Sequence, residues 1–464
     1  MSTVTTVPPR TRRNVELLLL LFAIGIVLLA YLNVGLVMQD EVPPDIATYG
    51  IGLTVLAVAF HLVLRWKASY ADPILLPIAT LLNGLGVVMI HRLDLAEGRT
   101  VANGLATKQL LWSAVSVVVA VVVLFVLRDH RILRRYTFTA MLAGIVLLLL
   151  PLLPIIGSAH YGSQIWIHLG PMSFQPGEVA KIVLTVFFAG YLVQTRDALS
   201  LVGKRVLGFP LPRARDLGPI LVVWAASIGV LVLEKDLGTS LLFFGLFVAM
   251  LYVATERTSW IAIGLLLFVG GSYVAYLLFG HVQERVLLWL HPFSPHALHV
   301  SDQLALGLMG MGNGGLLGTG LGQGHPELTY FAESDFIFPS FAEELGLVGA
   351  FALLVLYILL VERGLRTAVG ARDGFGKLLA VGLSFSLALQ CFVVIGGVTR
   401  VIPLTGLTTP FLSYGGSSLL ANWTIIAILL RISDQARRPL PDPATDAAAG
   451  SSPSGEATEV VRVR

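Results

Sequence analysis

The chain contains little charge and almost no cysteine. Charged residues make up only 13% of its 464 residues, hydrophobic residues make up 56%, and the mean hydropathy is +0.82. This composition excludes a soluble domain of this length and predicts an all-α, polytopic integral membrane protein. The single cysteine, Cys391, lies in an apolar run, which excludes an intramolecular disulfide. The net charge of +3 says little about nucleic acid, and we expect no nucleic-acid partner.

Twelve apolar runs are long enough to cross a membrane as helices. The first run follows Arg10, Arg12 and Arg13, and it is too long for a signal-peptide core, so we expect it to be retained. The expected spans are residues 15–38, 46–65, 73–91, 108–127, 136–156, 179–195, 217–233, 239–255, 259–280, 337–362, 376–398 and 415–432.

The positions of the basic residues predict the orientation. With the N-terminus inside, most of the 31 Lys and Arg fall on one side, among them those of the loops 128–135, 196–215 and 363–377. Basic loops stay on the cytoplasmic side, so both termini are expected to face the cytoplasm. Two expected outer segments then stand out, the polar loop 157–178 and the loop 281–336. The second is far longer than a connector needs to be, which favours an outward-facing function.

Three carboxylates lie at or within the start of the span after the long loop. Asp335 is expected at the outer end of this helix, and Glu343 and Glu344 about 12–13 Å deeper. A carboxylate at such a depth is a candidate functional group. For Asp335 alone, favourable placement at a helix N-terminus is an equally good interpretation.

Glu178 and Lys181 begin another helix at the same expected face, directly after Pro176. Their spacing of three residues places them on one helix face, where they can pair. The pair is either structural or offers Lys181 as a fixed cation to an anionic headgroup.

The segment 234–239 joins two expected spans at the outer surface. It is either a polar turn in which Asp236 or Thr239 caps the next helix, or part of a site. Arg285 and Arg400 are two of the few expected outer cations, and arginine binds phosphate oxygens well.

Other patterns argue against other chemistries. The glycine-rich run 307–324 is not preceded by a strand, which speaks against a nucleotide-binding loop. Histidines occur at 291, 296 and 299 without convincing further zinc ligands. Ser413 has no His and Asp at a recognisable spacing, so a serine nucleophile is not expected.

Four segments in this order resemble the SEDS family (shape, elongation, division and sporulation), which includes RodA and FtsW. The family's Gln-Pro-Ser-Glu-x-x-Lys stretch is found at 175–181, with Gly177 in place of Ser. Its Gln-Pro-Asp-Leu-Gly-Thr turn is found at 234–239, with Glu234 and Lys235 as departures. Two further stretches match at 335–346 and 403–418. The start of the chain and residues 83–94 look most like RodA-type proteins of actinobacteria.

The resemblance implies a ten-helix core over residues 73–432, preceded by two additional helices within 15–72. A cytoplasmic N-terminus (1–14) and a disordered cytoplasmic tail (433–464) would flank these parts. The resemblance also implies an enzyme of the bacterial cytoplasmic membrane. This enzyme would be a peptidoglycan glycosyltransferase that polymerises lipid II at the outer face of the membrane during cell elongation. The implied partner is a class B penicillin-binding protein, besides membrane lipid.

The family's essential aspartate falls on Asp335, which we expect to be the general base. The expected substrate-binding residues are Gln175, Glu178, Lys181, Asp236, Arg285, Gln303, Glu343, Glu344, Arg400 and Ser413. We expect no protein-only metal site and no organic cofactor, although Mg²⁺ or Mn²⁺ could assist the leaving pyrophosphate. The main alternative is a flippase for the same lipid, and another is a scaffold that only recruits the transpeptidase.

Overall fold

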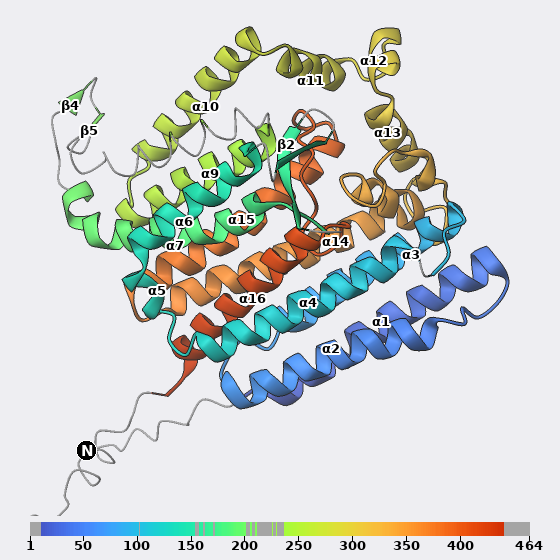
Figure 1. Ribbon diagram of the computed structural model, residues 1–464, viewed down its shortest axis with the longest axis horizontal. Coiled ribbons are helices and arrows are strands. Elements are labelled where there is room, and N and C mark those ends of the chain that lie inside the picture. Colours follow the sequence, from blue (N-terminus) through green and yellow to red (C-terminus); the bar gives the residue numbers. More distant parts are fainter. Residues whose placement is uncertain are drawn as a thin grey trace, which may run out of the picture.

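The computed structural model describes residues 11–101, 103–153, 157–160, 163–169, 172–200, 205–206, 209–210, 225, 229 and 236–439. Within these residues, ten helices are long and apolar enough to cross a membrane, and most of them lie side by side in one bundle (Figure 1). They are α1 (Arg13–Gln39), α2 (Ile46–Lys67), α3 (Leu75–Ala96), α4 (Leu105–Val126), α7 (Pro176–Ser200), α9 (Leu237–Thr255), α10 (Ser259–Leu278), α14 (Ile337–Gly370), α15 (Gly374–Val398) and α16 (Gly416–Arg437). The predicted polytopic, all-α class is confirmed.

Two of the twelve predicted spans do not appear among these ten. At 136–156, α6 (Thr137–Leu149) is a shorter helix that tightens into the 3₁₀ turn η1 (Leu150–Leu152) around Pro151. Proline has no N–H to continue the helical ladder, which accounts for the early end. The span predicted at 217–233 lies outside the described residues apart from two positions.

Both loops predicted to face outward contain regular structure. In the polar loop, β1 (Gly157–His160), β2 (Ser163–Leu169) and β3 (Met172–Phe174) form an antiparallel sheet that was not predicted. Outside these two loops, a two-stranded pair, β4 (Arg205–Val206) and β5 (Phe209–Pro210), lies in the basic loop after α7, which was predicted to be cytoplasmic. The long loop contains α11 (Gly280–Leu290), α12 (Pro295–Val300), α13 (Gln303–Gly314) and η2 (Pro326–Leu328). The short helix α5 (Ile132–Arg135) precedes α6.

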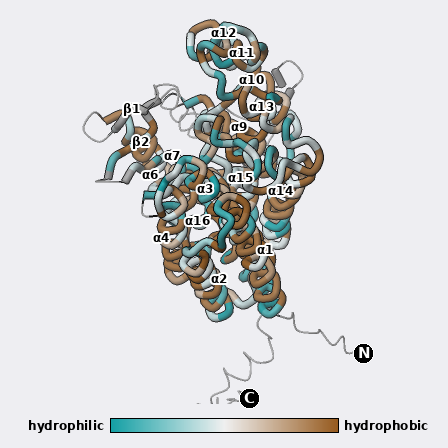
Figure 2. Tube along the Cα trace, turned by 90° about the vertical axis from the view of Figure 1, so that its right-hand side faces the viewer, coloured by the Kyte–Doolittle hydropathy of each residue, from teal (hydrophilic) through white to brown (hydrophobic). Residues whose placement is uncertain are grey.

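The surface of the bundle is apolar, as a membrane-spanning protein requires. Most of the length of the bundle helices has the colour of hydrophobic residues in Figure 2. Helix α10 lies at the edge of the bundle and exposes Leu265 and Leu266, whereas α3 and α16 are buried along most of their length. These exposed side chains are hydrophobic because the surface of a membrane-spanning bundle faces lipid.

Helices α1 and α2 are docked on the rest of the bundle by polar as well as apolar contacts. Tyr31 of α1 stacks on His91 of α3 with ring centroids 4.5 Å apart. At the other end of α1, buried Glu16 accepts a hydrogen bond from Arg13 and lies 2.7 Å from His61 Nδ1. These buried groups fix the first two helices against their neighbours.

The two ends of the bundle are distinct. The Asp335 end holds the starts of α14 and α16, and the Asp434 end holds the start of α1 and the end of α16. Asp434 is buried and accepts a hydrogen bond from Tyr70 N at 2.9 Å. Because of such contacts, α16 extends to Arg437, five residues into the predicted tail, and residues 440–464 lie outside the described part.

Candidate active site

Asp335 lies directly before α14, as predicted, and its side chain is half-buried. Ser334 Oγ donates a hydrogen bond to its Oδ1 over 3.2 Å. Its Oδ2 faces the loop before α16, where Gly406 has a φ of +76° and a Cβ added to it would lie 3.7 Å from Oδ2. The backbone of this loop therefore forms one wall beside the carboxylate.

Ser413 holds this loop against the segment that carries Asp335. Its hydroxyl donates to Ser334 O over 2.6 Å and accepts from Thr409 N over 2.8 Å. Gln109 Nε2 donates to Ser413 O over 2.9 Å, and Tyr414 N donates to Glu333 O over 2.7 Å. Ser413 was predicted to bind substrate, but its hydroxyl is occupied by these internal bonds, and substrate binding by it remains a prediction.

Arg285 of α11 is a cation whose charge interacts with both Asp236 and Asp335. Its Nη1 lies 3.4 Å from both Leu404 O and Thr405 O, so it reaches the same loop. Burial lowers the pKa of this guanidinium, and the negative charges of Asp236 and Asp335 act in the opposite direction. Arg285 therefore lies within electrostatic reach of both carboxylates.

The environment of Asp335 favours its protonated form. Burial raises the pKa of this carboxyl to about 6, and the charge of Glu333 adds to the shift. The hydrogen bond from Ser334 and the charge of Arg285 oppose it. A carboxyl that titrates near neutrality can accept a proton and still be ionised at physiological pH.

Asp236 caps α9, which was one of the two interpretations of its segment. Its Oδ1 accepts from Thr239 N over 2.9 Å, and its Oδ2 accepts from Thr239 Oγ1 over 2.5 Å. Burial raises the pKa of this carboxyl, and the bonds from Thr239 and the charge of Arg285 lower it. Glu234 and Lys235, the departures in this turn, lie outside the described residues.

Glu178 and Lys181 pair within α7, as predicted, and a third residue completes the group. Lys181 Nζ donates to Glu178 and, over 2.7 Å, to Gln390 Oε1 of α15. Gln390 Nε2 in turn donates to Thr408 O over 2.9 Å. The pair is thereby linked to the loop beside Asp335, and Lys181 is only 3% exposed. A contact of Lys181 with a headgroup stays a prediction.

Three other predicted residues have internal partners in the structure. Arg400, at a φ of +62°, donates to Trp289 O over 2.8 Å and to Leu290 O over 2.7 Å, so it ties α11 to the end of α15. Gln303 Nε2 donates to Tyr330 O over 2.7 Å. The backbone N–H of Gln175 donates to Ser417 Oγ over 2.9 Å.

Glu343 and Glu344 are buried, and the carboxylate of each has hydrogen-bond partners within the protein. Arg92 of α3 donates to Glu344, to Glu327 and to Gly324 O. Glu343 Oε1 accepts from His325 N over 2.9 Å. These acids therefore fasten the glycine-rich segment to α14, and a role in substrate binding stays a prediction for both.

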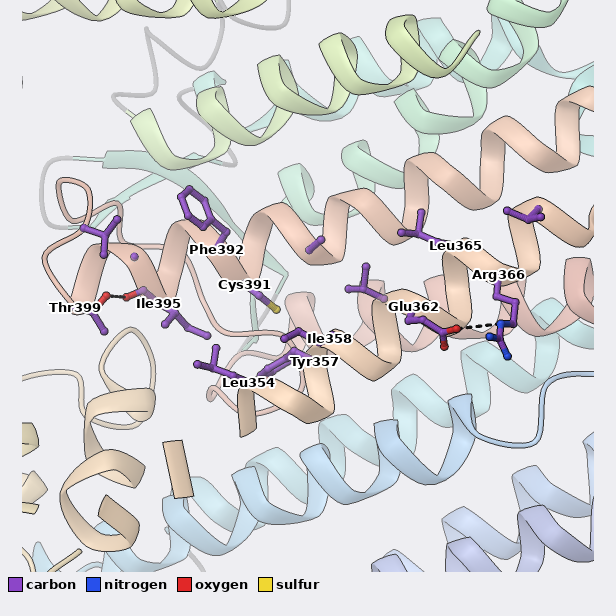
Figure 3. A pocket seen from close by; sticks show the side chains of 15 residues that line it. Leu354, Tyr357, Ile358, Glu362, Leu365, Arg366, Cys391, Phe392, Ile395 and Thr399 are labelled. Carbon is purple, nitrogen blue, oxygen red and sulfur yellow. Dashed lines mark hydrogen bonds and ion pairs between the residues drawn. The ribbon is translucent and has the colours of Figure 1, made fainter. Parts of the chain in front are cut away.

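An apolar groove of about 750 Å³ lies between α14 and α15, away from Asp335 (Figure 3). Tyr357 and Ile358 line it from one helix, and Cys391 and Phe392 from the other. Its lining is suited to an apolar chain or helix and contains none of the acids discussed above.

No three His, Cys, Asp or Glu side chains converge on a common point in the described part of the chain.

The sequence is similar to curated proteins along most of its length. The protein named peptidoglycan glycosyltransferase RodA from Mycobacterium tuberculosis is 51% identical over 94% of this chain and 93% of its own length. The RodA of Mycobacterium leprae is 49% identical, covering 94% of both chains. Because 94% of this chain is aligned, the similarity includes most of the two helices before residue 73.

Solved structures share the fold. A chain of a peptidoglycan synthase complex, described as coordinating polymerization and crosslinking, superposes with a TM-score of 0.62 at 26% identity, covering 79% of this chain and 98% of that one. The rod shape determining protein RodA of Thermus thermophilus gives a TM-score of 0.55 at 25% identity, covering 80% and 98%. The FtsW, RodA and SpoVE family, described as cell cycle proteins, matches residues 73–438. The chain therefore belongs to the FtsW/RodA/SpoVE family.

Proposed function

We propose that Asp335 is the general base with which this chain, a peptidoglycan glycosyltransferase, extends glycan strands from lipid II. The observation that carries the proposal is a half-buried carboxylate at the end of the bundle, beside Arg285, with its pKa raised to about 6. A base with this pKa is ionised in most molecules at pH 7 and still binds a proton effectively.

The reaction needs one proton acceptor and stabilisation of a leaving anion. Asp335 accepts the proton of the acceptor sugar's 4-hydroxyl while that oxygen bonds to the anomeric carbon of the donor. The bond from this carbon to the pyrophosphate oxygen breaks, and the lipid pyrophosphate leaves with the electron pair. One displacement inverts an α-linked donor to a β-linkage, so no covalent enzyme intermediate is needed.

Arg285 is the best-placed cation for the leaving pyrophosphate. It is half-buried and within electrostatic reach of Asp335, and its two internal contacts are long, at 3.4 Å from Nη1. Lys181 and Arg400 make shorter internal hydrogen bonds. Arginine binds phosphate oxygens through two parallel hydrogen bonds. A divalent cation, when bound to the pyrophosphate, would supply further charge neutralisation.

We place the Asp335 end at the outer face of a bacterial cytoplasmic membrane, with both termini in the cytoplasm. The basic residues Arg128, Arg363 and Arg437 belong to the Asp434 end, which fits a cytoplasmic location. The proposed partner is a class B penicillin-binding protein that cross-links the strands. The resemblance to RodA-type proteins favours duty in cell elongation.

Reconstitution with lipid II tests this function directly. Purified chain in vesicles is expected to produce glycan strands detectable on a gel, and chelation by EDTA is expected to lower the yield until Mg²⁺ or Mn²⁺ is restored. Lipid movement across the bilayer without any polymer would overturn the enzyme in favour of a flippase. Full activity in EDTA would remove the metal from the proposal and leave Asp335 in place.

The pH dependence of polymerisation reports on the proposed base. Because Asp335 must be ionised to act, kcat/KM is expected to fall about tenfold per pH unit below about 6 and to level off above it. Glu333→Gln removes a charge that raises the pKa of Asp335, so the acid limb should move to lower pH. Glu256→Gln, exposed and paired with Arg196 far from the site, is the matched control. An unchanged limb in Glu333→Gln would contradict the assignment.

A further inference from the structure

Residues 303–325 form a hairpin against the first part of α14. Helix α13 packs along α14 (Figure 1), the chain turns at Gly315, and a glycine-rich segment of turns leads on to η2. We infer that this hairpin is a re-entrant element inserted into the outer leaflet, with Leu316 and Leu317 in contact with lipid acyl chains. The inference is independent of the reaction proposed for Asp335.

Backbone hydrogen bonds to the hairpin replace part of the helical hydrogen-bond pattern of α14. The helix is broken at Gly346, which has φ +66° and ψ −169°. In an unbroken helix, the N–H groups of Leu347 and Val348 would bind the carbonyls four residues earlier. Here Leu347 N donates to Gly315 O over 2.9 Å, and Val348 N donates to Leu316 O over 3.1 Å.

The carbonyls released by this break accept hydrogen bonds from the glycine-rich segment after Gly315. Thr319 N donates to Glu343 O and Gly320 N to Glu344 O, each over 3.0 Å. The carboxylate of Glu344 accepts from Gly322 N over 3.0 Å. Irregular backbone is tolerated at membrane depth only where its polar groups are satisfied in this way.

Two glycines make this close approach possible. A Cβ added to Gly318, which has φ +87°, would lie 2.1 Å from Glu344 O. A Cβ added to Gly346 would lie 2.2 Å from Gly318 N. No larger residue fits at either position, so the glycine-rich composition has a packing reason and needs no nucleotide.

The length of α14 gives the depth of the hairpin tip. Its unbroken part from Leu347 to Glu362 rises about 22 Å, less than the hydrocarbon thickness of about 30 Å. Glu362 and Arg363 mark the polar boundary at the Asp434 end, so the other boundary lies about 8 Å beyond Leu347. The tip is bonded to residues 347 and 348, so it lies about 8 Å inside the leaflet.

The tip is exposed and apolar at this depth. Leu316 and Leu317 are 64% and 78% exposed. They adjoin the outward-facing residues Leu347, Val348 and Phe351 of α14, each more than half exposed. Because this surface is continuous with the lipid-facing side of a membrane span, acyl chains are the occupant we assign to it.

Site-specific quenching tests the insertion. In full-length protein carrying Cys391→Ala and reconstituted in nanodiscs, Leu317→Cys is labelled with an environment-sensitive fluorophore. We expect strong quenching by doxyl-labelled phospholipids and weak quenching by aqueous iodide. Phe351→Cys, on the lipid-facing side of α14, is the positive control, and His325→Cys, whose side chain is 71% exposed near η2, is the aqueous control.

Two results would overturn the inference. Iodide quenching of the Leu317→Cys label at the level of the His325→Cys label would place the tip in water. Protection from both quenchers would mean that protein, and not lipid, covers it. Polymer synthesis by each labelled variant shows that the variant is folded.

Discussion

Asp335→Asn is expected to lower glycan polymerisation from lipid II by about 10²- to 10⁴-fold, with little change in the amount of folded protein. The amide has nearly the shape of the carboxylate but cannot accept the proton of the sugar hydroxyl. The contacts that hold the segment, such as those of Ser413 with Ser334 O, do not involve the replaced group. The measurement is single-turnover strand synthesis at pH 7.5, with folding checked by thermal unfolding.

Glu333→Gln is the matched control for this prediction. It removes a half-buried carboxylate two residues away and is expected to keep nearly full activity at pH 7.5, where Asp335 is ionised in both proteins. Near-normal synthesis by a folded Asp335→Asn protein would contradict the role of a base. Equal losses in the two variants would assign the effect to local charge.

Arg92→Met is expected to lower the free energy of unfolding by about 3–5 kcal/mol. Arg92 is only 1% exposed and donates to Glu344, Glu327 and Gly324 O, so its removal leaves a fully buried carboxylate without its cation. The loss is measured as a lower midpoint of unfolding in detergent.

A second substitution distinguishes the unpaired charge from lost packing. In Arg92→Met/Glu344→Gln the charge is removed, while the amide oxygen can still accept from Gly322 N. The double variant should recover a substantial part of the stability. Arg99→Gln, at a partly exposed arginine paired with Asp94, is the control and should cost about 1 kcal/mol or less. Equal midpoints for the wild type and Arg92→Met would refute the argument.

Features of the site that involve residues close together along the chain could be predicted from the sequence. The pairing of Glu178 with Lys181 follows from a spacing of three residues in a helix, and the capping by Asp236 follows from its place at a helix start. The position of Asp335 before its helix follows in the same way. Helical periodicity and apolar length determine these features, so they need no tertiary information.

Contacts between distant segments were not visible in the sequence. Gln390 is a polar residue in an apolar run, a weak signal that could have marked it, but its bonds to Lys181 and Thr408 O depend on how α7 and α15 pack. Arg400 was expected to be an outer cation suited to phosphate, because its charge can be read from the sequence, whereas its bonds to the α11 carbonyls cannot. The re-entrant hairpin was interpreted as an outer loop because its glycines hide the apolar period of α13.

The shared ladder of α14 and the hairpin has a consequence for biosynthesis. The ribosome makes residues 303–325 before α14, yet the hairpin turn depends on carbonyl and N–H groups that only α14 supplies. The turn can therefore form these hydrogen bonds only after the helix that follows it has been synthesised. The segment carrying Asp335, which joins the two, reaches its final position only when this late docking step is complete.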